Sequence, residues 1–128
     1  MKMAKNICPL EAVEQSALVS WLEAKRLKFT AIPNGSYSQS WSVRMRNKRM
    51  GLRAGLPDIL VVIPADRCRL GRAVLCFIEL KRRKGGKVSE DQRCWIEALE
   101  EVRDVGASVC AGAEKAIESI NTLLNGKV

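Results

Sequence analysis

The first part of the chain carries apolar residues at helical spacing, which predicts a helix over about residues 10–26. The apolar stripe of this helix consists of Leu10, Val13, Ala17, Leu18 and Trp21. When successive residues advance by about 100°, Glu14 falls inside the same arc. A carboxylate is almost never buried without a partner. Glu14 therefore either lies at the edge of the stripe with its head in water or points inward toward a polar cleft.

Farther along, the pattern changes to short apolar runs that are typical of buried strands. The basic segment between the first helix and these runs fits neither pattern clearly. The other expected elements are an extended stretch over 29–32, an exposed loop over 36–42, strands over 58–63, 73–81 and 107–111, and helices over 89–103 and 113–124. This order predicts an α/β fold in which a central mixed β-sheet is flanked by helices.

A length of 128 residues without a long linker predicts a single domain over residues 1–128, with its core at about 10–125. The longest apolar run is far too short to span a bilayer. No apolar secretory core follows the lysines near the N-terminus. We therefore expect a cytoplasmic protein without a membrane partner.

Histidine is absent from the whole sequence, which excludes Ser–His and Cys–His nucleophiles, HExxH zinc sites and histidine-based nucleases. The five cysteines are an odd number and show no CxxC spacing. We therefore expect reduced, mostly buried thiols rather than structural zinc or disulfides. Any hydrolytic chemistry must use carboxylates, lysine and a hard cation.

The formal net charge is +8, and the cations are clustered. One acid-free cluster contains Arg44, Arg46, Lys48, Arg49 and Arg53, and a second contains Lys81, Arg82, Arg83, Lys84 and Lys87. Clustered positive charge favours a nucleic-acid partner over a basic face that is merely solvated. DNA is preferred to RNA because the chain has few aromatic residues and no RNA-binding signature.

Two acids stand at matching positions of the predicted strands, since Asp58 begins one strand and Glu79 lies near the end of the next. An antiparallel hairpin of these strands would have its midpoint near Cys68. The two carboxylates would then lie opposite one another, with Cβ atoms about 4.5–5.5 Å apart. Such like charges repel unless they are protonated or bridged by a cation, for which Mg²⁺ or Mn²⁺ is the natural choice.

Lys81 shares a strand face with Glu79 because the two residues are two positions apart, whereas Leu80 points into the core. Taken alone, this pair also fits an ion pair at the surface. Gln92 is equally ambiguous. It lies within the apolar stripe of its helix, which consists of Trp95, Ile96, Leu99 and Val102. With Ser89 it also matches the S-x-x-Q capping box of a helix start.

The residues Pro57, Asp58, Glu79 and Lys81 form a PD…ExK pattern, which resembles the PD-(D/E)xK nuclease superfamily. Within that superfamily, the layout of nearly the whole chain is similar to a stand-alone, phage-like VRR-NUC (virus-type replication-repair nuclease) domain. The further positions that carry this resemblance are Glu14, Gln15, Asn34, Gly35, Gly55, Ser89, Gln92, Trp95 and Gly106. The resemblance implies a restriction-endonuclease-like core.

The resemblance also implies roles for single residues. Asp58 and Glu79 would bind a divalent metal together with the Leu80 carbonyl, and Glu14 would serve a second ion or its waters. Lys81 is the motif lysine and Gln92 a supporting polar group. We expect Lys81 to act electrostatically or to position water rather than to act as the base, because neighbouring carboxylates favour its charged form.

The resulting expectation is a Mg²⁺- or Mn²⁺-dependent, structure-specific DNA endonuclease of a bacterial or phage-infected cell. Small single-domain members of the resembled family are similar to Holliday-junction resolvases and act as homodimers, so a four-way junction is the expected substrate. The alternatives are a nuclease for flaps, nicks or duplex DNA, and a catalytically silent DNA-binding module. Tyr37 and Trp41 in the polar loop either stack on bases or serve in packing.

Overall fold

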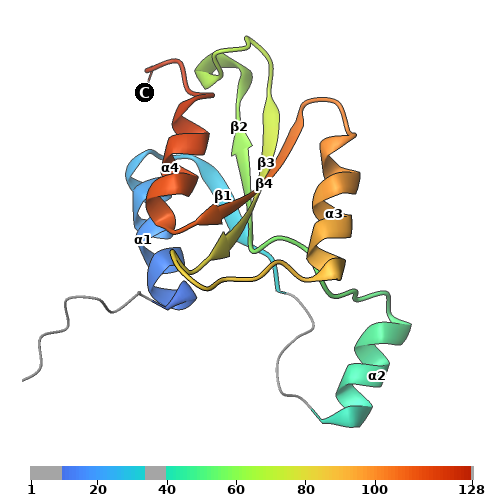
Figure 1. Ribbon diagram of the computed structural model, residues 1–128. Helices are drawn as coiled ribbons and strands as arrows, with labels where there is room; N and C mark the ends of the chain where they lie inside the picture. The colour runs from blue at the N-terminus through green and yellow to red at the C-terminus, as the bar shows by residue number, and fades with distance from the viewer. Residues whose placement is uncertain (1–9, 34–39, 128) are drawn as a thin grey trace, which may run out of the picture.

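The computed structural model describes residues 10–33 and 40–127 of the chain. The elements in chain order are α1 (Glu11–Ala24), β1 (Lys28–Ala31), α2 (Trp41–Arg49), β2 (Ile59–Ile63), the 3-10 turn η1 (Ala65–Arg67), β3 (Val74–Lys81), α3 (Glu90–Glu100), β4 (Val105–Ala111) and α4 (Ala113–Asn121). Figure 1 shows them along the chain, with α2 standing apart at the end of a connecting segment. The predicted α/β class is confirmed.

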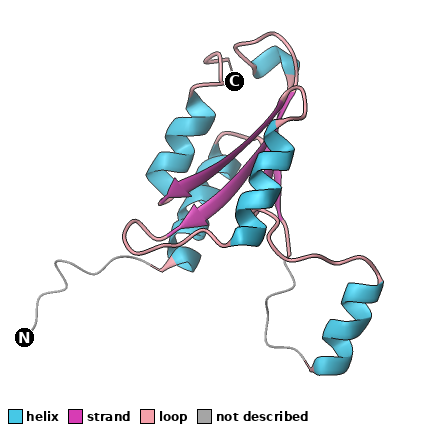
Figure 2. Cartoon of the chain, turned by 45° about the vertical axis from the view of Figure 1, so that its right-hand side comes forward, coloured by secondary structure: helices cyan, strands magenta, loops and turns pink. Residues whose placement is uncertain are grey.

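The four strands form one mixed sheet in the order β1-β2-β3-β4. β1 and β3 both run antiparallel to β2, whereas β3 and β4 are parallel. A parallel pair needs a crossover connection, and α3 provides it. α1 and α4 cover one face of the sheet and α3 covers the other (Figures 1 and 2). The sheet is therefore a middle layer between helices, as predicted.

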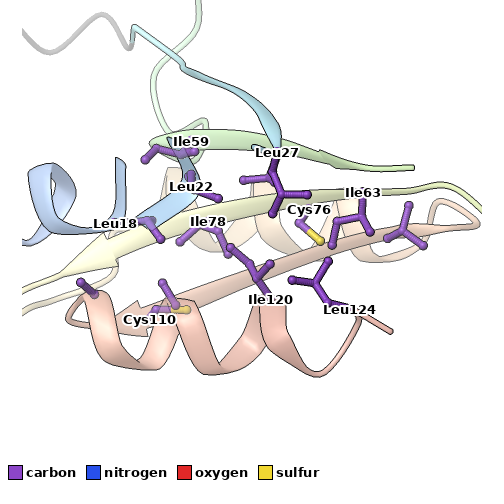
Figure 3. Close-up of a cluster of buried hydrophobic side chains, with 14 of the residues drawn as sticks. Leu18, Leu22, Leu27, Ile59, Ile63, Cys76, Ile78, Cys110, Ile120 and Leu124 are labelled. Atoms are coloured by element: carbon purple, nitrogen blue, oxygen red, sulfur yellow. The ribbon is translucent and has the colours of Figure 1, made fainter. Parts of the chain in front are cut away.

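The main hydrophobic core fills the space between the sheet and the pair α1 and α4 (Figure 3). Alternate residues of β2 and β3 point into it because side chains along a strand alternate between faces. Its fully buried members include Leu18, Leu22, Ile59, Ile63, Ile78, Leu80 and Ile120. The expected inward direction of Leu80 is confirmed.

The buried face of α1 differs from the predicted stripe. Leu10 and Val13 are 63% and 57% exposed, and Ala17 is exposed as well. The helix instead buries Glu14, Leu18 and Leu22, which follow one another at intervals of four residues. The prediction was wrong by a rotation of the helix because the terminal Leu10 and Val13 were weighted equally with the central residues. Of the two positions left open for Glu14, the structure shows the inward one, since Glu14 is only 3% exposed.

The basic segment that the sequence left ambiguous forms α2. Ser40 caps its N-terminus by accepting a hydrogen bond from the Val43 N–H at 3.4 Å, and Gly51, with φ of +102°, follows its end. No residue of this helix is buried. Trp41, expected in an exposed loop, is the first helical residue and is 69% exposed. Tyr37, Asn34 and Gly35 lie outside the described residues.

Several element ends also differ from prediction. α3 ends at Glu100 rather than residue 103, so Val102 leaves the apolar stripe and is exposed. β4 begins at Val105 because its parallel pairing with β3 starts there, and Gly106 lies within the strand. Cys68, Cys76 and Cys110 are buried free thiols, whereas Cys94 is exposed. No helix within residues 10–33 or 40–127 is long and apolar enough to cross a membrane.

Candidate active site

The register of β2 and β3 places the two motif acids opposite one another. Ile59 pairs with Ile78, so one position beyond them Asp58 faces Glu79. Since Ile59 and Ile78 belong to the core and neighbouring side chains alternate, both carboxylates lie on the sheet face turned away from it. The predicted hairpin, centred near Cys68, is confirmed.

Backbone hydrogen bonds on both sides hold Asp58. Its carboxylate Oδ2 accepts a hydrogen bond from the Leu80 N–H at 2.8 Å, and its carbonyl accepts one from the Ile32 N–H at 2.8 Å. In the same register Pro57 lies opposite Leu80. Proline has no N–H, so it cannot complete the ladder bond to the Leu80 carbonyl. The neighbouring strands thus hold Asp58 in place. The Leu80 carbonyl receives no hydrogen bond from Pro57.

Glu79 is buried, with only 2% of its surface exposed. Its Oε2 atom accepts a hydrogen bond from Gln92 Nε2 at 3.0 Å and lies 3.4 Å from Lys81 Nζ. Its Oε1 atom is buried and has no hydrogen-bond partner among the described residues. A buried acceptor without a donor is costly. Glu79 is therefore an incompletely satisfied carboxylate beside a second carboxylate.

Burial, together with the nearby charge of Asp58, raises the pKa of Glu79 from its ordinary value of 4.5 to about 7, although Lys81 acts in the opposite direction. Both causes penalise the ionised form. A divalent cation offsets both penalties, since it supplies positive charge and accepts the unpartnered oxygen as a ligand. The residues present therefore fit a hard, oxygen-ligated cation.

Glu14 is not brought into this acid pair. Its Oε2 accepts from Arg83 Nε at 2.8 Å, and its Oε1 accepts from the Ala113 N–H at 3.0 Å. The amide of Ala113 and then Arg83 hold the pKa of Glu14 below its usual value, against the effect of burial. Gly112 is required beside this contact, because a Cβ there would lie 2.9 Å from Arg83 Cγ.

The expected cluster of three acids is therefore not formed, and within residues 10–33 and 40–127 no three acid, cysteine or histidine side chains are grouped as a metal site. The physical reason is that α1 packs on the core face of the sheet, whereas Asp58 and Glu79 lie on the other face. Glu14 instead ties α1 to the N-terminus of α4, where a carboxylate is favoured by the free amides and the helix dipole.

Gln92 forms the capping box of α3 and also contacts Glu79. Its Oε1 accepts from the Ser89 N–H at 3.0 Å, and its own N–H donates to Ser89 Oγ at 3.1 Å, which completes the capping box. Its Nε2 donates to Glu79. Because an amide carries both an acceptor and donors, one side chain fixes the start of α3 and binds the acid pair.

The helix α2 and the segment between β3 and α3 both lie toward the lower end of the sheet in Figure 1, where β3 ends. Arg44, Arg46, Lys48 and Arg49 are on α2 and exposed, Arg53 follows that helix, and Arg82, Arg83, Lys84 and Lys87 form the exposed segment between β3 and α3. Among these residues, Arg53 and Arg83 have contacts that also fix the local structure. Arg53 donates to the carbonyls of Lys48 and Leu52 at 3.0 and 3.1 Å, and Arg83 pairs with Glu14.

Sequence reasoning did not assign three contacts around the site. Arg83 was interpreted only as a DNA ligand, although a buried Glu14 needed a cation. Gly55, with φ of +102°, lies so close to α3 that a Cβ would be 2.7 Å from the Asp91 carbonyl carbon. Trp95 Nε1 donates to the Ala54 carbonyl at 3.2 Å. The Gly55-x-Pro57-Asp58 spacing could have indicated a tight turn, but not that the turn packs against Asp91 of α3.

A mixed sheet between helices, with the PD…ExK acids on adjacent antiparallel strands, is an α/β fold consistent with that of VRR-NUC nuclease domains. The chain belongs to the VRR-NUC family, since the VRR-NUC domain matches residues 5–114. It is also similar to a solved structure named "VRR_NUC domain protein", with a TM-score of 0.65 and 24% identity over 90% of this chain and 88% of that chain. No curated relative matches the chain. Membership implies a nuclease-type function with DNA as substrate.

Proposed function

We propose that this protein is a divalent-metal-dependent endonuclease that hydrolyses phosphodiester bonds of DNA. The observation that carries the proposal is the buried, unpartnered Oε1 of Glu79 opposite Asp58. A carboxylate with a raised pKa and an incomplete set of donors is typical of a functional site rather than of a structural ion pair. Mg²⁺ and Mn²⁺ are the ions that suit such oxygen ligands.

Asp58, Glu79 and the Leu80 carbonyl are the proposed ligands. When bound there, the ion would supply Lewis-acid neutralisation of phosphate charge and lower the pKa of a water. Glu14 is left out of this set because both of its oxygens already accept hydrogen bonds. All three proposed ligands therefore come from one hairpin, β2–β3, which fixes their relative positions.

Lys81 and Gln92 are proposed to act beside the acids. Lys81 Nζ lies 3.4 Å from Glu79 Oε2, and its side chain is only 13% exposed. Gly86 folds over it so closely that a Cβ would lie 2.8 Å from Lys81 Cβ. This held ammonium group can donate to a phosphate oxygen or orient a water. Gln92 keeps Glu79 in position through its Nε2 donor.

For the substrate, we propose a branched DNA, with a four-way junction cut by a homodimer as the first candidate. Two linked active sites are the simplest way to place paired nicks across a junction. The exposed cations on α2 and in the β3–α3 segment would bind the DNA backbone. Flapped, nicked or linear duplex DNA is the alternative substrate within the same chemistry.

The decisive experiment incubates the purified full chain with labelled junction, flap, nicked and linear DNAs of matched sequence, with Mg²⁺, Mn²⁺ or EDTA. Cleavage that requires metal supports the enzyme, and the most rapidly cut DNA identifies the substrate geometry. Light scattering under the same conditions gives the oligomeric state, and a monomer would remove the paired-nick model. A protein that cuts none of the DNAs and gains no thermal stability from either metal would be a silent DNA-binding module.

A further inference from the structure

A groove outside the acid pair lies between α2 and α3. Its volume of about 480 Å³ is within the usual range for sites of small ligands. Its lining comes from α2, from the segment that connects α2 to β2, and from the first two turns of α3. Figures 1 and 2 show α2 standing clear of the sheet on the α3 side. The proposed backbone contacts use two of its lining residues, Arg44 and Lys48, but no role described so far uses Trp95 or the open space beside it.

The wall on the α3 side is fixed in place. Trp95 lines the groove, and its Nε1 donates to the Ala54 carbonyl at 3.2 Å. Gly55 lies against Asp91 so tightly that no side chain fits between them. The hydrogen bond to Ala54 satisfies the only polar atom of the Trp95 side chain and fixes the ring. The ring is therefore held, half-buried, beside an open space. Such a ring is a stacking surface.

The opposite wall carries positive charge. Arg44 and Lys48 lie four residues apart on α2, so they occupy one face of that helix, and both line the groove together with Arg53. Asp91 is the one acid among the lining residues. A groove with an aromatic wall and a cationic wall is complementary to a nucleotide, whose base stacks and whose phosphate is anionic.

The groove is connected to the acid pair through α3. Gln92, which donates to Glu79, lies between Asp91 and Trp95 in the first two turns of the helix. A chain of nucleotides that passes the acid pair can therefore extend along α3 toward Trp95. The start of α3, which defines this path, is held by the Ser89–Gln92 capping box and by the close contact of Gly55 with Asp91.

The geometry points to a nucleotide subsite in this groove, in which an unpaired base of the DNA stacks on Trp95 while Arg44 and Lys48 bind its backbone phosphates. The inference rests on the proposed DNA-directed function and adds a preference for DNA with an unpaired base, which the acid pair does not specify. A fully paired duplex keeps its bases stacked inside, whereas a branch point or flap can present an unpaired one. The subsite thus selects for unpaired nucleotides.

The test compares two labelled duplexes that differ at one bulged position, which carries either a base or an abasic residue. Dissociation constants of the full chain are measured by fluorescence anisotropy in EDTA, so that cleavage does not contribute. We expect the base-bearing DNA to bind roughly tenfold more tightly, as for a single stacked base. Trp95→Ala should bring this ratio close to one, whereas Trp95→Phe should retain most of it.

Trp41→Ala is the matched control, because Trp41 is an exposed tryptophan of α2 that does not line the groove. It should leave the ratio unchanged. Arg44→Ala should weaken binding of both DNAs equally. A ratio near one in the unchanged protein, a ratio unaffected by Trp95→Ala, or a ratio removed by Trp41→Ala would each overturn the subsite.

A second measurement keeps the test valid if Trp95→Ala does not fold. In the Trp21→Phe, Trp41→Phe chain, Trp95 is the sole remaining tryptophan. Its emission should be quenched by the base-bearing DNA and not by the abasic one; equal quenching by both overturns the proposal. Cleavage with Mg²⁺ is assayed separately. A preference for the base-bearing DNA without cleavage would reject the proposed enzymatic function and support the subsite. Cleavage without such a preference would support the enzymatic function and reject the subsite.

Discussion

Two buried glutamates on opposite faces of the same sheet have opposite electrostatic environments. Glu14 is 3% exposed and Glu79 is 2% exposed, so burial does not distinguish them. The Ala113 amide and Arg83 lower the pKa of Glu14, whereas burial and Asp58 raise that of Glu79 to about 7. The difference comes from the donors that surround each carboxylate.

This difference distinguishes an acid held by charged and backbone donors from the acid that we propose as a ligand of the ion. Both oxygens of Glu14 accept hydrogen bonds from groups that favour its charged form. In Glu79, one oxygen accepts from the Gln92 amide and lies 3.4 Å from Lys81 Nζ, and the other has no hydrogen-bond partner in the described part of the chain. A site that is left unsatisfied by the protein can be completed by a ligand.

The largest expected effect is the difference in cleavage rate between a variant on the Glu79 face of the sheet, Asp58→Ala, and one on the opposite face, Glu14→Ala. Asp58→Ala removes a ligand of the proposed ion and should reduce metal-dependent cleavage far more than the about 10- to 100-fold typical of an outer-shell partner. Glu14→Ala should leave the rate of the folded fraction within a few-fold of the original. Single-turnover cleavage of the best DNA substrate measures both. Equal losses in the two variants would break the comparison.

Lys81→Ala sharpens the comparison on the Glu79 side. The held ammonium group is expected to act on the reacting phosphate and not in general binding, so its loss should lower the single-turnover rate by roughly 10²-fold. DNA affinity measured in EDTA should change little. A variant that binds DNA weakly but cuts bound DNA at the original rate would assign Lys81 to backbone binding instead.

Gln92→Ala is expected to reduce cleavage by roughly 10- to 100-fold, since Gln92 orients a ligand without being one. The same change also removes half of the capping box. Ser89→Ala is the matched control, because it removes a capping hydroxyl, at a cost of about 1 kcal/mol, and leaves the contact with Glu79. A similar loss of activity in both variants would mean that Gln92 acts only as a helix cap.

The stability of the metal-free protein should respond to the two glutamates with opposite signs. Between pH 4.5 and 7 the folded state holds a proton on Glu79 that the unfolded state has lost, so stability falls as pH rises. Glu79→Gln should therefore stabilise the protein at pH 8 by up to about 3 kcal/mol and have little effect at pH 5.

Glu14→Gln should destabilise the protein by about 1–3 kcal/mol, because a charge-assisted hydrogen bond to Arg83 is lost. The lowered pKa of Glu14 means that its contribution is present above pH 4.5 and is lost as pH falls below it. Urea unfolding in EDTA at pH 4, 5 and 8 measures both variants. Shifts of the same sign at pH 8 would contradict the opposite electrostatics of the two sites.

The smallest expected effect concerns the adjacent arginines Arg82 and Arg83. Arg82→Ala should reduce the slope of log affinity against log salt by about 0.9 on duplex DNA, if it contacts one phosphate. Arg83→Ala should change the slope less, because Glu14 already balances its charge. Titrations of DNA at several salt concentrations provide the slopes. A larger change for Arg83 would mean that DNA displaces Glu14.

The sequence predicted the sheet and the acid pair because each depends on local periodicity. The apolar run of β2 and the nearly equal sequence distances of Asp58 and Glu79 from Cys68 were sufficient to predict the hairpin. Helical geometry placed Glu14 within the apolar arc but left open whether its carboxylate was buried. The partners of Glu14 could not be predicted, since Arg83 and Ala113 lie 69 and 99 residues away in the chain, and no local pattern encodes such contacts.

Two other differences have the same physical origin. The basic residues of α2 lack an apolar stripe, so hydrophobic periodicity could not identify the helix, although Ser40 and Gly51 mark its ends. The apolar residues Leu10 and Val13 suggested a buried stripe, but they lie at the first turn of α1, beyond the edge of the core. Packing at the ends of elements is decided by neighbours that local sequence does not specify.

The hydrogen bond from Ala113 to Glu14 also bears on how the chain is made. α1 is synthesised before any other described element, yet the carboxylate of Glu14 in its first turn accepts hydrogen bonds from Arg83 and from the Ala113 amide, 69 and 99 residues later. Until Ala113 leaves the ribosome, the buried face of the helix carries a charge that lacks one of its two partners. Docking of α1 is thus tied to the arrival of the N-terminus of α4. The domain is expected to mature in one late, cooperative step rather than element by element during translation.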